Sequence, residues 1–167
     1  MALYDDRFQI ITDLENSWVD IKKEYESVIS EDLHMKWPET FLYKGDWNVF
    51  GLTANYQPIG NIHDFFHKTA SILKKYDTLI CNAGFSVLKP NTIIHKHRGY
   101  TNKVLRCHLG ITIPEGDCAL QVEDNVIRWK NGRAFIFDDT LTHSAWNITT
   151  ETRTIMLLDL DKDLLLS

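Results

Sequence analysis

The chain has 167 residues, of which 44% are hydrophobic and 25% charged, and its formal net charge is −5 at pH 7. This length predicts one domain over residues 1–167, and neither the composition nor any apolar run fits a membrane protein or a general nucleic-acid binder. The amino terminus, MALYDDRFQI, lacks the pattern of a secretory signal and the number of cysteines, three, is odd, so we expect a cytoplasmic protein.

Helices are expected in the first part of the chain, about residues 1–78. After Ser17, a candidate N-cap, apolar residues recur at helical spacing: Trp18, Ile21, Tyr25 and Val28. A second helix is predicted over residues 61–77, beginning at Asn61. Its expected apolar face consists of Ile62, Phe65, Phe66, Thr69, Ile72, Leu73 and Tyr76.

The second predicted helix carries two histidines at the i, i+4 spacing of zinc peptidases, His63 and His67. Asp64 stands where such an enzyme has its general base Glu. Both histidines fall on the flank shared with Ser71 and Lys74, where solvated residues lie. We therefore interpret them as surface residues rather than metal ligands.

After Tyr76 the pattern changes to short β-like runs: FSVL, NTIIHKH, NKVLRCHLGITI, CALQVE, VIRW, RAFIF and RTIMLLDL. The dipeptide Asn131-Gly132 predicts a type I′ hairpin turn between VIRWK and RAFIF. The chain is thus expected to be mainly β with flanking helices. Its core, over about residues 79–160, is predicted to be a barrel or jelly roll.

One of these runs, NKVLRCHLGITI, has two different faces. The side-chain period of two places Leu105, Cys107 and Leu109 on one face, and Arg106 and His108 on the other. Taken alone, the polar face fits a solvated surface as well as a pocket. Inside a barrel it would line a pocket.

The segment HKHRGYTNKVLRCHLG, residues 95–110, gathers three histidines, two arginines and two lysines in an acidic chain, which fits a small anion. Further on, His143 and Arg153 lie ten residues apart. A histidine followed at this distance by an arginine, with another histidine on an earlier strand of a barrel, is the pattern of an iron and 2-oxoglutarate site. Ferrous iron accepts imidazole nitrogen, and the planar guanidinium meets a carboxylate with two hydrogen bonds.

These residues resemble the aspartyl/asparaginyl β-hydroxylases, iron(II)- and 2-oxoglutarate-dependent dioxygenases built on a double-stranded β-helix, a cupin-like barrel. The similarity runs from about Lys44 to Asp159. It is carried by GDW from Gly45, HRGYTN from His97, LRCHLGITIP from Leu105, GRAFIFDDTLTHSAWN from Gly132, and Arg153.

The resemblance implies a role for each matching residue. His97 and His143 would be the iron ligands, and Arg153 would bind the far carboxylate of 2-oxoglutarate. The same co-substrate site would be lined by Arg106, His108, Ser86 and Trp47. The implied cofactors are Fe(II), 2-oxoglutarate as co-substrate, and O2.

The metal ligands leave two questions open. His95 lies two residues before His97, so strand parity allows either to reach a metal, and only the motif favours His97. Most oxygenases of this mechanism carry Asp or Glu two residues after the first histidine, where this chain has Gly99. We interpret Asp138 and Asp139 as turn residues. The resemblance then implies a two-histidine site with water in the third protein position.

Other departures concern the substrate and the surroundings of the domain. Arg98 and Tyr100 stand where the family often has a small residue and proline, which favours a different and more anionic substrate. The chain ends in DLDKDLLLS instead of the family's tryptophan, histidine and proline. Because no helical repeat or membrane anchor accompanies the domain, we expect a stand-alone catalytic domain.

The expected activity is hydroxylation of a C–H bond, at the β-carbon, of an aspartyl or asparaginyl-like amino acid, peptide or carrier-tethered substrate. 2-Oxoglutarate would be converted to succinate and CO2. One alternative is a halogenase in which a halide takes the position left by Gly99. Another is a non-catalytic barrel that binds a small acid. The presence of both histidines together with Arg153 favours the oxygenase, because an acid-binding protein needs only the arginine.

Overall fold

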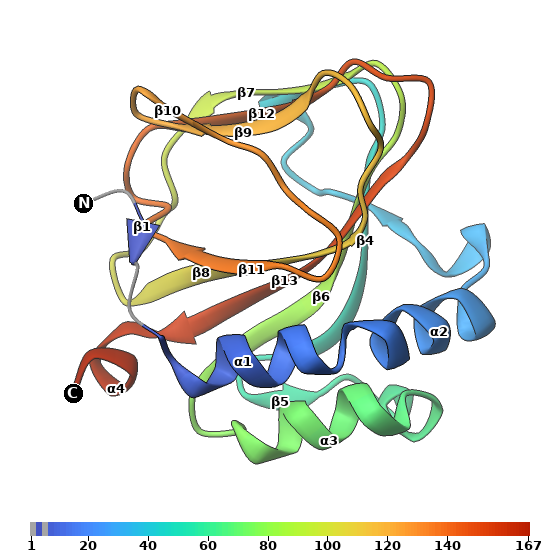
Figure 1. Ribbon diagram of the computed structural model, residues 1–167, viewed down its shortest axis with the longest axis vertical. Coiled ribbons are helices and arrows are strands. Elements are labelled where there is room, and N and C mark those ends of the chain that lie inside the picture. The colour runs from blue at the N-terminus through green and yellow to red at the C-terminus, as the bar shows by residue number, and fades with distance from the viewer. Residues whose placement is uncertain (1–2, 5–6) are drawn as a thin grey trace.

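The structure is a computed structural model that describes residues 3–4 and 7–167. Two β-sheets face each other, and helices cover the outer side of the larger sheet (Figure 1). The helices are α1 (Gln9–Asn16), α2 (Trp18–Val28), α3 (His67–Lys75) and α4 (Lys162–Leu166), with 3-10 turns at η1 (Glu31–Leu33), η2 (Thr40–Leu42) and η3 (Ile62–Phe65).

The larger sheet has the strand order β1-β11-β8-β13-β6-β4-β2, with β5 paired to β4. Its strands are β1 (Leu3–Tyr4), β2 (Met35–Lys36), β4 (Trp47–Ala54), β5 (Gln57–Pro58), β6 (Ile80–Leu88), β8 (Val104–Thr112), β11 (Ala134–Phe137) and β13 (Arg153–Asp161). The last strand, β13, lies in the middle between β8 and β6, and both pairings are antiparallel.

The smaller sheet has the order β10-β9-β12-β7-β3. Its strands are β3 (Tyr43–Lys44), β7 (Thr92–His97), β9 (Cys118–Val122), β10 (Asn125–Ile127) and β12 (His143–Asn147). From β6 onwards the chain alternates between the two sheets, except that β9 and β10 form a hairpin within the smaller one, and this is the connectivity of a jelly roll. The predicted fold, a mainly β double-stranded β-helix with flanking helices, is therefore confirmed.

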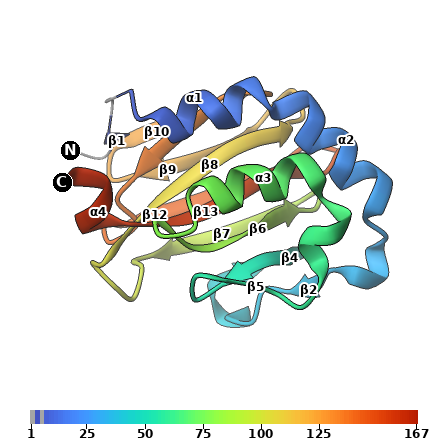
Figure 2. The same cartoon turned by 90° about the horizontal axis from the view of Figure 1, so that it is seen from below.

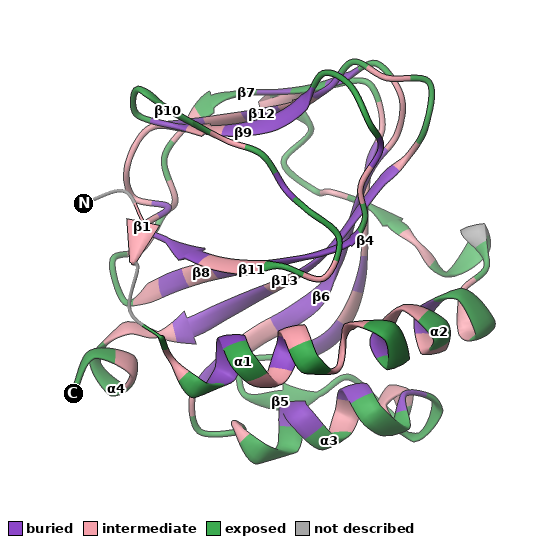
Figure 3. Ribbon diagram, in the orientation of Figure 1, coloured by how far each residue is buried: buried purple, intermediate pink, exposed green. Residues whose placement is uncertain are grey.

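Helices α1, α2 and α3 pack on the outer face of the larger sheet (Figure 2). Buried aliphatic side chains from both layers form this core, including Leu105, Cys107, Leu109 and Ile111 of β8, as the period of two predicted. Buried residues lie on the facing sides of helices and sheet, and exposed ones lie on the outer helix faces (Figure 3). A second buried cluster fills the space between the two sheets. The candidate site lies beside this second cluster.

The helical predictions were right in part. Helix α2 follows Ser17 as expected, although the Ser17 side chain makes no capping hydrogen bond. The second predicted helix is instead divided, because η3 ends before Phe66 and α3 begins at His67. Phe65 is consequently exposed, whereas Phe66 is buried. The break also places His63 and His67 on different elements, so they do not share one helix.

The predicted hairpin at Asn131-Gly132 is wrong. Strand β10 pairs with β9 in the smaller sheet, whereas β11 pairs with β8 in the larger one. Gly132 has a positive φ of 75°, but Asn131 is not among the residues in that region, although a type I′ turn requires positive φ at both positions. The dipeptide thus lies where the chain crosses between sheets.

In the part of the chain that the structure describes, no helix is both long enough and apolar enough to span a bilayer.

Candidate active site

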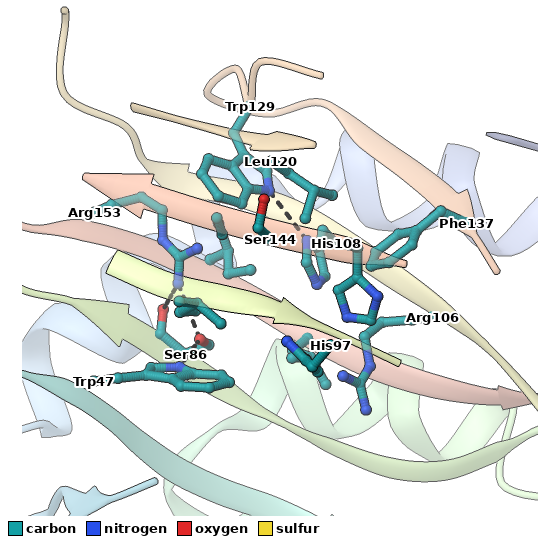
Figure 4. A pocket seen from close by; sticks show the side chains of 15 residues that line it. Trp47, Ser86, His97, Arg106, His108, Leu120, Trp129, Phe137, Ser144 and Arg153 are labelled. Carbon is teal, nitrogen blue, oxygen red and sulfur yellow. Dashed lines mark hydrogen bonds between the residues drawn. The ribbon is translucent and has the colours of Figure 1, made fainter. Parts of the chain in front are cut away.

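A cavity between the two sheets collects the residues that the sequence singled out. Trp47, Ser86, His97, Arg106, His108, His143 and Arg153 all line it. They come from six strands that are distant in sequence, and Figure 4 shows their side chains gathered around one space. The cavity measures about 30 Å³, which is room for about one water molecule. A ligand the size of 2-oxoglutarate therefore requires that lining side chains move apart.

His97 and His143 face each other across the pairing of β7 with β12. They are register partners, and their ring centroids lie 4.2 Å apart. Each Nδ1 is close to a backbone carbonyl two residues earlier, 2.7 Å from His95 O and 2.8 Å from Leu141 O. We assign the proton to Nδ1 in both rings, which leaves a bare Nε2 lone pair on each. This is the tautomer that a pair of metal-ligating histidines needs.

A β-bulge separates His95 from His97. His143 is opposite His97 and Ala145 is opposite Ile94, so β7 has one residue more than β12 in this interval. His95 is exposed and does not line the cavity. The parity argument that placed both histidines on one face is therefore wrong, because a bulge interrupts the period of two.

Burial, together with the neighbouring His97, lowers the pKa of His143 to about 4. The ring is consequently neutral at pH 7, as a metal ligand must be. Within residues 3–4 and 7–167, no cluster of three or more His, Cys, Asp or Glu side chains is arranged to hold a metal ion.

The side chain of Asp139 lies where residue 99 would carry its own side chain. A Cβ added at Gly99 would come 2.6 Å from Asp139 Cγ. The Gly99 N–H also donates to Asp139 O at 2.7 Å. Asp139 is 3% exposed, its Oδ1 has no hydrogen-bond partner among the described residues, and burial raises its pKa.

The two neighbouring aspartates therefore differ. Asp138 is a turn residue as predicted, because its Oδ1 accepts hydrogen bonds from the backbone N–H and the hydroxyl of Thr140. Asp139 also lies in the predicted turn, but its carboxylate makes no hydrogen bond within that turn. Its carboxylate instead lies against Gly99, with Oδ2 3.6 Å from Arg106 Nη2.

At the other end of the cavity Arg153 is 2% exposed and has no carboxylate partner among the described residues. Its Nη2 donates to Ser86 Oγ at 2.9 Å and to Ser86 O at 3.2 Å (Figure 4). Trp47 donates to the same Ser86 Oγ at 2.9 Å. The guanidinium lies 4.5 Å from the ring of Trp129, and its Nε has no partner. A buried cation without a carboxylate indicates an anionic ligand.

His108 adds a second unused donor. Trp129 Nε1 donates to His108 Nδ1 at 3.1 Å, so the His108 proton must lie on Nε2. That Nε2 is buried and has no partner among the described residues. Burial holds the pKa of His108 well below its usual range, so the ring is neutral. The donors of His108 and Arg153 suit a carboxylate, and the bare Nε2 atoms of His97 and His143 suit ferrous iron, so the residues present fit both groups.

Comparison with known proteins decides the family. The profile of the aspartyl/asparaginyl β-hydroxylase family matches residues 15–163. The chain belongs to this family. It is 31% identical over 157 residues to the human aspartyl/asparaginyl β-hydroxylase, covering 90% of this chain and 21% of that protein. It is also 41% identical over 87 residues to the ornithine lipid ester-linked acyl 2-hydroxylase of Rhizobium tropici, covering 51% of this chain and 31% of that one. The chain thus spans about a fifth of the human relative.

Solved structures support the same fold. A viral collagen prolyl hydroxylase from Paramecium bursaria Chlorella virus-1, described as a 2OG complex, aligns with a TM-score of 0.58 at 12% identity, covering 88% of this chain and 92% of that one. A 2OG-Fe(II) oxygenase family oxidoreductase from Burkholderia pseudomallei gives the same TM-score at 10% identity, covering 87% and 79%. At such low identity these similarities show the jelly roll alone.

Several contacts in and around the site of this family member were not predicted from the sequence. Trp129 contacts both His108 and Arg153, but its place in the run VIRW gave no sign of this. The contact of Asp139 with Gly99 was not predicted, because it joins segments forty residues apart. The stacking of Trp37 on Trp47 was not predicted either, because Trp37 lies in a stretch without a regular pattern.

Proposed function

We propose that this chain is an iron(II)- and 2-oxoglutarate-dependent hydroxylase and that residues 1–167 act as a single catalytic domain. The observation that carries the proposal is the pairing of two bare imidazole nitrogens with a buried, carboxylate-free arginine in one cavity. An acid-binding protein would need the arginine but not the two facing histidines. This argues for the oxygenase over the non-catalytic alternative.

His97 and His143 would hold the iron through Nε2, with their Nδ1 protons fixed on backbone carbonyls. Arg153 would bind the far carboxylate of 2-oxoglutarate with two parallel hydrogen bonds, assisted by the Ser86 hydroxyl and the Nε2–H of His108. When bound, ferrous iron supplies the activation of O2 that breaks the substrate C–H bond. The protein side chains position the reactants and exclude water around them.

The proposed reaction balances as follows. One atom of O2 enters the substrate, converting C–H to C–OH, and the other enters succinate as 2-oxoglutarate loses CO2. The substrate would be an aspartyl or asparaginyl-like amino acid, peptide or carrier-tethered group, hydroxylated at the β-carbon. The Rhizobium tropici relative, whose name records an ester-linked acyl substrate, supports the inclusion of tethered substrates.

Halogenation by the same site is the less favoured reading. It requires a halide where other oxygenases have a carboxylate ligand. In this chain the Asp139 side chain already lies against Gly99. A buried carboxylate repels a halide at that point, whereas it accepts a hydrogen bond from water. We therefore infer that water takes the third protein position.

Three free and buried cysteines, Cys81, Cys107 and Cys118, support our proposal of a reducing compartment such as the cytoplasm.

Succinate formation tests the proposal. The chain is loaded with Fe(II) and given 2-oxoglutarate and O2 with a panel of aspartyl and asparaginyl peptides, free amino acids and tethered acids. We expect one class to stimulate succinate release and to gain the mass of one oxygen atom in chloride buffer. A product in which chlorine replaces hydrogen would instead support the halogenase. No succinate above the level of a His97→Ala, His143→Ala double variant would contradict the proposal.

A further inference from the structure

Trp129 lies in the segment 128–133, which carries the chain from β10 in the smaller sheet to β11 in the larger one. We call it the crossing segment. Trp129 is 4% exposed, whereas the charged residues on either side of it, Arg128 and Lys130, are exposed. Of these three side chains, the indole is therefore the one that enters the protein, and it lines the cavity of the candidate active site.

The crossing segment is fixed to β8 close to His108. The Gly132 N–H donates to Gly110 O at 2.9 Å. A Cβ at Gly110 would overlap the carbonyl of Lys130, so the absence of a side chain there allows this close approach. Trp129 directly precedes Lys130. Its ring is consequently held at a fixed place relative to His108, which lies two residues before Gly110 on β8.

The edge of the indole determines which nitrogen of His108 carries the proton (Figure 4). Trp129 Nε1–H can only donate, and it lies 3.1 Å from His108 Nδ1, which must therefore be the bare nitrogen. The proton is left on Nε2, which is buried and has no partner among the described residues. The opposite tautomer would have a lone pair at Nε2, and a lone pair repels a carboxylate oxygen. The contact with Trp129 thus makes His108 a donor towards an anion.

The face of the same indole holds Arg153. The guanidinium carbon lies 4.5 Å from the ring centroid, and the attraction between a cation and an aromatic face is strong where water is excluded, as it is around this 2% exposed arginine. Ser86 accepts from Nη2, and Nε has no partner among the described residues. The indole face thus limits rotation of the guanidinium and keeps the Nε–H available to an anion.

We propose that Trp129 is a positioning residue of the co-substrate site, whose indole edge sets the tautomer of His108 and whose face orients Arg153. This inference rests on the proposed function and deepens it, because one side chain then controls two donors that would hold 2-oxoglutarate. The role differs from that of a packing residue. It depends on the indole N–H and not only on the volume of the ring.

The tautomer of His108 tests this role without iron or co-substrate. Imidazole nitrogen-15 signals of metal-free protein labelled at histidine distinguish a protonated from a bare ring nitrogen, and His108→Leu identifies the signals of His108. In the wild type at pH 7 we expect Nε2 protonated and Nδ1 bare. Trp129→Phe keeps an aromatic ring but lacks the N–H, so the Nδ1 signal should shift towards the protonated position. The wild-type measurement needs no substitution and decides the tautomer even if a variant unfolds.

Affinity for 2-oxoglutarate is the second readout, measured by anaerobic calorimetric titration of the Fe(II)-loaded chain. Trp129→Phe should weaken binding about two- to fivefold, because the tautomer that can donate becomes only a fraction of the population. Trp129→Leu removes the aromatic face as well. It should weaken binding at least roughly tenfold, since Arg153 is then no longer held by a buried cation–π contact.

A His108→Leu background separates this role from packing. If the indole N–H acts through His108, Trp129→Phe should change the affinity less than about 1.5-fold once the imidazole is absent. A packing contribution of the ring would be the same in both backgrounds. Trp146→Phe is the control and should leave the affinity unchanged, because Trp146 lies outside the cavity and its Nε1–H donates to Asp117.

A wild-type His108 protonated at Nδ1, or a tautomer that Trp129→Phe leaves unchanged, would overturn the inference. So would a Trp129→Phe variant that binds 2-oxoglutarate as the wild type does, or an equal loss of affinity in the His108→Leu background. If the wild type binds 2-oxoglutarate while any of these results is found, the inference alone fails. If the wild type does not bind 2-oxoglutarate, the proposed function fails, whatever the tautomer of His108.

Discussion

At the scale of single residues, Gly99 and Asp139 form a matched pair. A methyl group at position 99 would overlap the Asp139 carboxylate group. We expect Gly99→Ala to lower the free energy of unfolding by about 1–3 kcal/mol, as overpacking of a buried site does. Chemical denaturation measures this change.

The matching control is a double-mutant cycle with Asp139→Ala, which removes the group that clashes. The Gly99→Ala penalty should fall to less than about half when Asp139 is absent. An equal penalty in both backgrounds would show that Asp139 does not occupy the position of the missing side chain.

Residue-scale chemistry also separates His97 from His95. His97→Ala should abolish binding of Fe(II), because its Nε2 faces His143 across paired strands. His95→Ala should retain it, because the His95 side chain lies outside the cavity and only its carbonyl contacts His97. Anaerobic equilibrium dialysis with Fe(II) distinguishes the two. Retained binding in His97→Ala with loss in His95→Ala would contradict the assignment.

At the scale of elements, Glu24 of α2 caps α3. Its carboxylate accepts hydrogen bonds from the backbone N–H groups of Lys68 and Thr69, at 2.7 and 2.9 Å, and from the Thr69 hydroxyl at 2.6 Å. These are first-turn groups without partners inside the helix. Glu24→Ala should lower the free energy of unfolding by about 1–2 kcal/mol.

Glu26 on the same helix is the control for Glu24. Its carboxylate is exposed, and its ion pair with Lys22 is long, at 4.0 Å from Nζ. Glu26→Ala should change the free energy of unfolding by less than about 0.5 kcal/mol. Similar losses in the two variants, measured by urea denaturation, would show that the contact between α2 and α3 does not stabilise the fold.

At the level of single elements, the sequence correctly predicted the features that depend on the local periodicity of apolar residues. The alternation of Leu105, Cys107 and Leu109 with Arg106 and His108 is a local property of β8, and the structure has it as expected. Helix α1 was not predicted, because its N-cap residue is Phe8, which makes no side-chain capping hydrogen bond. The prediction of a hairpin at Asn131-Gly132 was wrong because β11 pairs with β8 in the larger sheet, and this pairing outweighs the local turn preference.

The same distinction holds within the candidate site. Motif spacing identified His97, His143 and Arg153 as candidate site residues, and in the structure all three line one cavity. The exclusion of His95 depends on a bulge, and the position of Asp139 depends on its contact with a strand end far away in sequence. Neither can be read from a periodic pattern, because both arise from the pairing of distant segments.

At the scale of the whole molecule, buried neutral histidines make the metal-free protein sensitive to acid. Burial lowers the pKa of His143 to about 4 and holds that of His108 well below its usual value of 6.5. The unfolded chain therefore binds protons at pH values where the folded chain does not. Stability that is present above pH 6.5 is lost as the pH falls towards 4, at up to about 1.4 kcal/mol per pH unit for each histidine.

Denaturant unfolding of chelator-treated protein at pH 7 and pH 5 measures this loss. His108→Gln should reduce the difference between the two pH values, because glutamine does not titrate. His67→Gln serves as the control, since His67 is exposed at the start of α3. A pH dependence that His108→Gln leaves unchanged, or stability that rises on acidification, would contradict the burial of neutral imidazoles.

The central claim is that two histidines and one arginine of this chain bind ferrous iron together with 2-oxoglutarate. Anaerobic titration of 2-oxoglutarate into the Fe(II)-loaded protein, followed by visible absorption, tests it most directly, because a 2-keto acid chelated to ferrous iron gives a charge-transfer band. The wild-type chain should develop this band, and His97→Ala and His143→Ala should not. Arg153→Ala should need at least roughly 30-fold more 2-oxoglutarate to develop the same band. Removing one partner of a buried charge pair costs about 2–5 kcal/mol of binding free energy. The absence of the band in the wild type, or an Arg153→Ala variant that titrates like the wild type, would contradict the account.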